Sequence, residues 1–177
     1  MVATKLERKY MAHYIDTTFS YAGYGNITWT PAWYRLGEDL QEYTVEMNPA
    51  CEIEKNFLGD DVVVHTGYDM SGEAETFYAY VNDPLFVKLQ DIIDNNRYGS
   101  ACLTLAVEVQ LWHGGSSPGQ DMQYIAVLRP CYVVPTGYGG DTSGYQIPFT
   151  VQYLNNFIKH GLFAPNGSGS GTFTEIT

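Results

Sequence analysis

The sequence predicts a mainly β protein, with a β-sandwich or barrel-like domain and one flanking α-helix. Several stretches alternate apolar and polar residues with a period of two, which is typical of half-buried strands. Only one stretch has the period of an amphipathic helix, and residues that favour turns separate the segments. At 177 residues the chain suits one domain with a sizeable core. We expect an extended N-terminal arm at residues 1–40, a β core with the helix at residues 41–155 and a C-terminal arm at residues 156–177.

Residues 1–40 carry no sustained period but are rich in aromatic side chains. A solvated tail would be polar instead. We therefore expect an extended arm, or irregular strands, packed on its own domain or on a neighbouring chain.

Two acidic strands are predicted next. Residues 42–47 read EYTVEM and residues 50–55 read ACEIEK, and both alternate. The second strand would direct Cys51 and Ile53 inward, and the Asn48-Pro49 pair between the strands is a turn signal. Each strand would therefore have one buried face and one acidic face.

Four short segments lead to the helix. We expect a turn at residues 56–61, a strand at residues 62–65, a loop at residues 66–74 and a strand at residues 75–81.

The helix is predicted at about residues 83–95. Asp83 is placed to cap the first turn, and Pro84 suits the first helical position because the missing N–H costs nothing there. The apolar side chains form one stripe, and Asn95, Asn96 and Gly99 supply the stop. We expect the stripe to pack on a sheet face.

Two longer strands and a loop follow the helix. Residues 101–112 alternate well, and residues 113–121 read as a flexible hairpin loop. Residues 122–134 form a strand that Pro130 should bend or place at an edge.

The stretch 135–153 begins as a glycine-rich loop and then alternates strictly. Pro148 cannot donate to a ladder, which predicts a marginal or bulged strand. The tail is flexible by composition, with a possible last strand at residues 172–177.

No pattern meets the requirements of an enzyme, a metal centre or a cofactor site. The glycines of residues 137–144 lack a phosphate-loop pattern and lead into a strand instead of a helix. The histidines stand singly, without a second ligand at metal-binding spacing. No serine or cysteine has a base and an orienting group beside it. We expect no catalysis, no metal and no cofactor.

Composition favours assembly and disfavours gripping of nucleic acid. Only 16% of the residues are charged while 15 are tyrosine, and interfaces are enriched in aromatic residues and poor in lysine and glutamate. The net charge is −11, so the basic footprint of a nucleic-acid-binding protein is missing. Such a surface would let DNA slide past without sticking.

The sequence also predicts the compartment. The three cysteines form no metal or redox spacing, which fits a reducing compartment. The first residues lack the apolar core of a signal peptide, and no apolar run approaches the roughly 18 residues of a membrane span. We expect no membrane partner.

Four stretches resemble phage tail tube proteins, the major tail proteins of tailed bacteriophages and prophages. They read WYRLGEDLQEYTVEMNP (33–49), NFLGDDVVVHTGYDMSGEAETFYAYVNDPLFVKLQDII (56–93), VVPTGYGGDTSGYQIPFTVQY (133–153) and GTFTEIT (171–177). The likeness spans most of the chain beyond residue 30, and the first 30 residues match nothing in that family.

This resemblance implies a structural virion protein that forms stacked hexameric rings, a hollow tube assembled in the host cytoplasm. Its partners would be further copies of itself, a tape-measure protein, and tail terminator and baseplate proteins. DNA would pass through the lumen on ejection without sequence-specific binding. The loop at residues 135–144 would place the following strand where sheet edges of neighbouring subunits meet.

Two sets of residues follow as candidates for this role. Polar side chains on the alternating strands are candidates to face the lumen, although the strands cannot all line one channel. These are Glu42, Thr44, Glu46, Glu52, Glu54, Glu108, Gln110, Gln146, Thr150 and Gln152. Aromatic and loop residues are candidates for contacts between subunits. These are Tyr21, Tyr24, Trp29, Trp33, Tyr68, Met70, His113 and Tyr138.

Three alternatives remain open from the sequence. The tube could belong to a contractile tail or injection machine instead of a non-contractile tail. A carbohydrate-binding β-sandwich would use Trp29, Trp33 and tyrosines to stack on sugars. A small hydrolase would use the acidic strands, with one carboxyl pKa raised in a pocket.

Overall fold

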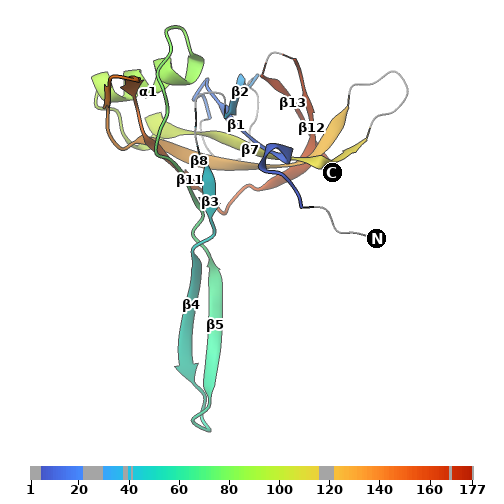
Figure 1. Cartoon of the computed structure of the whole chain (residues 1–177). Helices are drawn as coiled ribbons and strands as arrows, with labels where there is room; N and C mark the ends of the chain where they lie inside the picture. Colours follow the sequence, from blue (N-terminus) through green and yellow to red (C-terminus); the bar gives the residue numbers. More distant parts are fainter. Residues whose placement is uncertain are drawn as a thin grey trace.

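The chain folds into a curled antiparallel sheet that carries one projecting hairpin (Figure 1). This computed structural model describes residues 5–21, 30–37, 40, 42–115, 122–167 and 169–176. The fold is mainly β with one α-helix in the described residues, as the sequence predicts, and is consistent with a β-sandwich or barrel-like class.

The main sheet has nine strands, seven of them in the order β2-β1-β7-β8-β11-β6-β3, and every pairing is antiparallel. The other two, β12 and β13, join it because β12 pairs with both β8 and β13. The bounds are β1 (Met11–Asp16), β2 (Trp33–Leu36), β3 (Thr44–Glu46), β6 (Ser71–Ala74), β7 (Leu103–Gly115), β8 (Gln123–Pro135), β11 (Phe149–Tyr153), β12 (Lys159–Pro165) and β13 (Gly171–Glu175).

Strand β8 changes partners at Pro130. Its residues 124–128 pair with β12 and its residues 131–135 pair with β11. Pro130 lies between the two sets, and its carbonyl accepts a hydrogen bond from the Leu154 amide at 2.8 Å. The prediction of an edge position is therefore corrected: this proline lies in a central strand, where its missing N–H coincides with the change of partner.

The central strands bury side chains on both faces. One core lies on the side of helix α1 (Pro84–Asp94) and contains Ile15, Leu89, Val133 and Phe149. A second core on the opposite face contains Tyr14, Val107, Leu128 and Phe163. Two cores on one sheet explain why β7 is also buried along the first part of its outer row, at Thr104 and Ala106.

Helix α1 forms where the sequence predicts it, with Leu85, Leu89 and Ile92 buried. The Asp83 carboxylate accepts hydrogen bonds from the Phe86 amide at 2.8 Å and from the Tyr34 hydroxyl at 2.6 Å. The cap therefore also ties the helix to β2. Two short 3-10 turns complete the helical elements of the described residues, η1 (Arg8–Tyr10) and η2 (Gly99–Cys102).

Hydrogen bonds outside the strand pairings stabilise the curled shape of the sheet. The Arg35 amide of β2 donates to the Gly169 carbonyl, 3.1 Å away in the turn between β12 and β13. Arg8, just before β1, donates from Nη2 to the Tyr43 carbonyl at 3.0 Å, just before β3. Elements that are far apart in the strand order thus approach each other.

The segments predicted as terminal arms supply strands to this sheet. Within residues 1–40, β1 pairs with both β2 and β7, so this part packs on its own domain. Within residues 156–177, β12 and β13 pair with the sheet, and β13 realises the last predicted strand. The described parts of both segments are held because their aromatic side chains, Tyr14, Trp33 and Phe163, enter the core.

The element that projects lies in the middle of the chain instead. Strands β4 (Pro49–Lys55) and β5 (Asp61–Tyr68) form a separate two-stranded hairpin that leaves the body below β3 (Figure 1). All seven residues of β4 are exposed. The predicted burial of Cys51 and Ile53 is therefore wrong for the single chain, because no other strand or helix in the described part of the chain covers β4.

Three further predictions around β6 and β11 are corrected. Residues 66–74 contain the end of β5 and all of β6, where a loop was expected, and residues 75–81 contribute only isolated bridges at Phe77 and Tyr78. Pro148 does separate β11 from β10 (Gly144–Gln146), which pairs with β9 (Gly139–Asp141). Strand β11 lies between β8 and β6, so the glycine-rich loop does not bring it to an edge.

Candidate functional site

One polar surface spans β3, β6 and β11 and borders the end of β8. The strand register aligns Thr44 with Glu73, Glu73 with Thr150 and Thr150 with Val134. The next row aligns Glu46 with Ser71 and Gln152. Alternation directs Val45, Gly72, Ala74 and Val151 to the core, so the polar set shares the outer side. We call the acidic face the six residues Thr44, Glu46, Ser71, Glu73, Thr150 and Gln152.

Side chains at the border extend the acidic face. Thr44 donates from Oγ1 to a Glu42 carboxylate oxygen at 3.4 Å, and Gln152 donates from Nε2 to an Asp69 carboxylate oxygen at 2.8 Å. The carboxylates of Glu42 and Asp69 therefore add to those of Glu46 and Glu73. The named side chains of this surface are negatively charged or neutral, as DNA is negatively charged. None of them is a cation that could bind a DNA phosphate.

Five of the ten candidates for the lumen thus come together: Glu42, Thr44, Glu46, Thr150 and Gln152. Five lie elsewhere. Glu52 and Glu54 belong to the projecting hairpin, Gln146 lies in β10, and Glu108 and Gln110 lie on β7. Sequence reasoning missed Ser71 and Glu73 because it read residues 66–74 as a loop. The alternation of small with polar residues in SGEA is the signal that would have found them.

Glu108 belongs to a buried polar cluster on the helix side of the sheet. Its side chain is 16% exposed and its carboxylate lies 3.7 Å from His13 Nδ1 and 3.9 Å from Arg129 Nε. The His13 ring packs edge-on against Tyr43, whose hydroxyl is 2.8 Å from the Tyr153 hydroxyl. Neither His13 Nδ1 nor Arg129 Nε has a hydrogen-bond partner among the described residues.

Burial governs the protonation of this cluster. It lowers the pKa of His13 to about 4, and the nearby Arg8 guanidinium acts in the same direction. Burial raises the pKa of Glu108, partly opposed by Arg129. Burial also raises the pKa values of Tyr43 and Tyr153. His13 is therefore neutral at pH 7, and the shifts have the ordinary cause of polar groups within a core.

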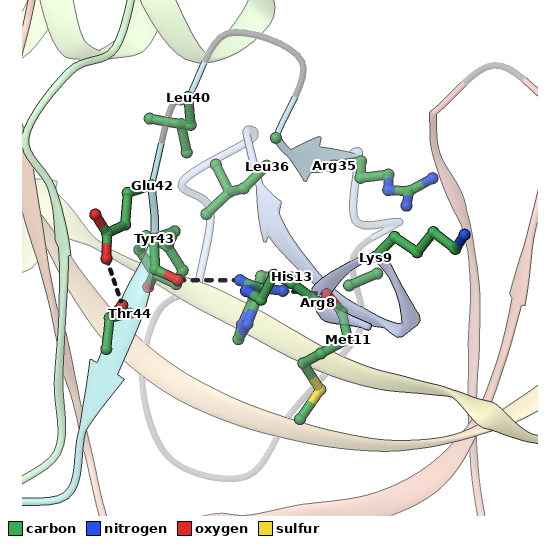
Figure 2. Close-up of a pocket in the computed structure, with 12 residues that line it drawn as sticks. Arg8, Lys9, Met11, His13, Arg35, Leu36, Leu40, Glu42, Tyr43 and Thr44 are labelled. Atoms are coloured by element: carbon green, nitrogen blue, oxygen red, sulfur yellow. Dashed lines mark hydrogen bonds between the residues drawn. The ribbon is translucent and has the colours of Figure 1, made fainter. Parts of the chain in front are cut away.

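An open cavity of about 560 Å³ adjoins this cluster (Figure 2). Three cationic side chains line it, Arg8, Lys9 and Arg35, together with the apolar side chains of Met11, Leu36 and Leu40. Glu42, Tyr43 and Thr44 line the side that leads into β3. We call this the basic pocket. Its described lining thus combines cationic with apolar side chains.

The projecting hairpin is the third surface with unusual chemistry. Its turn exposes Phe57 (104%) and Leu58 (82%), and its strands expose Ile53 (73%) and Val63 (65%). Single exposed apolar residues are common on proteins, but contiguous ones mark interaction surfaces. The hairpin therefore has the composition of a contact element.

The candidates for contacts between subunits divide into three groups. Tyr21, Trp33 and Met70 are buried in the cores of their own chain, which leaves them no surface to offer a neighbour. Tyr68, His113 and Tyr138 are exposed. Tyr24 and Trp29 lie outside the described residues.

The described residues contain neither a metal-binding cluster nor a membrane-spanning helix, and the comparisons with known proteins identify no relative. Within the described ranges, no three His, Cys, Asp or Glu side chains come together to hold a metal ion. In the same ranges, no helix has the length and apolar character needed to cross a membrane. A scan against protein-family models found no family that matches the chain, and a search of curated proteins found no similar sequence.

Proposed function

We propose that this protein is a structural subunit whose copies assemble into a hollow tube, as tail tube proteins of bacteriophages do. The observation that carries the proposal is the hairpin β4–β5, which leaves the body and exposes apolar side chains that the single chain never buries. An isolated two-stranded hairpin is at best marginally stable in water. Burying one leucine or phenylalanine side chain contributes about 1.5–3 kcal/mol, so contact with another copy would stabilise the hairpin and favour assembly.

The sheet edges support association in a ring. In the described residues β3 pairs only with β6, and β13 pairs only with β12, so each has one free edge. Free edges present unpaired backbone groups that readily pair with another chain. Joining copies through such edges closes a ring, and hexameric rings stacked on one another form the tube.

The acidic face supports a role as the wall of the channel. Glu46 and Glu73 lie on adjacent strands next to the free edge of β3. If β3 meets the neighbouring copy, this face continues around the ring. Its carboxylates repel DNA phosphates within a Debye length of about 8 Å, which prevents adhesion while DNA passes. The same bore accommodates a tape-measure protein before DNA enters, and terminator and baseplate proteins close the tube in the virion.

Electron microscopy of the purified protein tests the proposal together with a hairpin variant. Wild type should form rings and tubes in negative stain. The double variant Phe57→Ser, Leu58→Ser should remain folded by circular dichroism but need at least roughly tenfold more protein to form tubes. Val87→Ser is the matched control, because it removes an apolar side chain that is 53% exposed on helix α1, away from the hairpin. Wild type that stays monomeric at high concentration would contradict the proposal.

A further inference from the structure

The basic pocket concentrates positive charge in a strongly acidic chain. The chain has nine Lys and Arg residues against a net charge of −11, and three of the nine, Arg8, Lys9 and Arg35, line this one cavity. Arg8 is already held by the carbonyl oxygens of Met11 and Tyr43. Lys9 pairs with the exposed Glu7 carboxylate at 2.6 Å and lies over the Tyr10 ring, and Arg35 extends beside it (Figure 2). The cavity therefore suits an acidic group that carries an apolar portion.

The tip of the hairpin has that complementary chemistry. Residues 56–61 expose Phe57 and Leu58, and Asp60 and Asp61 follow after Gly59. From Pro49 to Tyr68 the hairpin carries four carboxylates and one lysine, a net charge of −3. An apolar side chain near acids matches the apolar and cationic side chains that line the basic pocket.

The tip is also shaped in advance. The Asn56 side-chain oxygen accepts hydrogen bonds from the amides of Leu58 and Asp60, both at 2.9 Å. The Asn56 amide donates to the Asp60 carbonyl at 2.9 Å, and Lys55 pairs with Asp61 at 2.8 Å. A turn that is already ordered loses less entropy on docking, which favours its use as an insertion element.

Chain geometry excludes docking of the tip into its own pocket. Glu42, Tyr43 and Thr44 bring the pocket to the start of β3, whereas the hairpin departs from the other end of β3 (Figures 1 and 2). The seven residues of β4 carry the tip about 24 Å further away. Two complementary surfaces beyond opposite ends of β3 make a head-to-tail contact, and such a contact builds an open filament when the rotation between copies does not close a ring.

We infer that the hairpin tip, residues 56–61, inserts into the basic pocket of the next copy along the assembly axis. This inference rests on the proposed function, because the assembly axis is the axis of the proposed tube. The inserted hairpin tip would supply the contact that stacks one ring on the next. In this contact, Phe57 and Leu58 of one copy pack against the apolar side chains of the pocket, Met11, Leu36 and Leu40. The carboxylates of Glu54 and Asp60 face the cationic side chains of Lys9 and Arg35.

Disulfide trapping tests the contact directly. Cys51 is exposed and is first replaced by serine, while Cys102 and Cys131 are buried and stay. Leu58→Cys and Lys9→Cys are then combined in one chain and oxidised. We expect a ladder of dimers, trimers and longer species on a denaturing, non-reducing gel. Leu58→Cys with Lys88→Cys is the control, because Lys88 lies on helix α1, and should give no ladder.

Charge reversal gives an independent readout in the same preparations. Lys9→Glu with Arg35→Glu should raise the protein concentration needed for stacking at least roughly tenfold, because like charges then face each other. Adding Glu54→Lys with Asp60→Lys to that chain should restore stacking. Lys88→Glu should have no effect.

The outcomes separate this contact from the tube itself. Tubes that form normally without a ladder, and are indifferent to charge reversal, would overturn the inference and leave the proposed function standing. A ladder from a protein that forms no rings or tubes would uphold the contact and refute the tube. Absence of both the ladder and the tubes counts against the contact as well, as does an equal ladder from the Lys88 control.

Discussion

His13 and Glu108 lie side by side in adjacent strands, and burial acts on both. The His13 pKa falls to about 4 and the Glu108 pKa rises, so both shifts favour the neutral forms of the two groups. At 3.7 Å the His13–Glu108 contact is longer than a hydrogen bond. At neutral pH His13 thus acts as an uncharged ring that packs on Tyr43.

This arrangement predicts loss of stability in acid. His13 has a lower pKa folded than unfolded, so its contribution is complete above pH 6.5 and declines as the pH falls towards about 4. The loss amounts to about 3 kcal/mol across that window. Glu108 acts oppositely, because its raised pKa favours the folded state as it protonates.

The variant His13→Phe should flatten the pH dependence. Urea unfolding of both proteins between pH 7 and pH 4 measures the difference. We expect wild type to lose about 3 kcal/mol more than the variant over that range. Equal slopes for the two proteins would show that His13 does not titrate as its burial requires.

Glu108 is a residue whose burial the sequence pattern does not predict. Its alternating strand, residues 101–112, correctly predicts Leu105, Val107 and Val109 inside. The same alternation assigns Glu108 to a solvated face, yet it is covered because β1 supplies His13 beside it. Residues 11–16 carry no period by which to recognise β1, so a second buried face could not be foreseen.

At the scale of elements, local signals predicted the helix best. Asp83 and Pro84 define the start of α1 through a cap and a fixed φ angle, both of which act within one turn. Strand pairing acts over long separations, as between β1 and β7, and no local signal encodes it. This is why the alternating patterns predict β7, β8 and β11, whereas they predict neither β9 nor the places of β1 and β6 in the sheet.

Removing the cap should destabilise the protein measurably. Asp83→Ala removes the acceptor for the Phe86 amide and for the Tyr34 hydroxyl, so we expect a loss of about 1–2 kcal/mol in urea unfolding. Asp94→Ala, at the exposed end of the same helix, should cost under about 0.5 kcal/mol. Similar losses for both variants would contradict the assigned role of the cap.

The hairpin should contribute little to the stability of the single chain. The Asp69 amide donates to the Asn48 carbonyl at 3.1 Å, so the two ends of the hairpin are adjacent and a short Gly-Asn turn can replace residues 49–68. We expect the thermal midpoint of the shortened protein to stay within about 3 °C of that of wild type, because no core side chain is lost. Loss of cooperative unfolding in calorimetry would refute this.

At the scale of the whole molecule, acidic and basic side chains gather on different surfaces. The acidic face carries carboxylates from β3 and β6, and the cationic side chains Arg8, Lys9 and Arg35 gather at the basic pocket. A uniform excess of acid would only keep the protein soluble. Separate acidic and basic surfaces suit a subunit whose bore repels DNA and whose contact surface attracts the next copy.

Reversing the charge of the acidic face should create affinity for DNA. Glu46→Lys with Glu73→Lys leaves the core side chains unchanged, so tubes should still form. Tubes of this variant should bind duplex DNA in 50 mM salt and release it as salt rises, because binding depends on counterion release. Glu52→Lys with Asp94→Lys is a charge-matched control, because both side chains are exposed and lie away from the acidic face. Equal DNA binding by the control tubes would place the acidic face outside the bore.

The central claim is that copies of this chain form a continuous pipe with an electronegative bore. Cryo-electron microscopy of the assembled protein tests it most directly, since the reconstruction gives the residues that line the channel. We predict stacked hexameric rings with Glu46 and Glu73 facing the lumen and the β4–β5 hairpin spanning from one ring to the next. Discrete monomers in the images, or a bore lined by lysine and arginine, would contradict it.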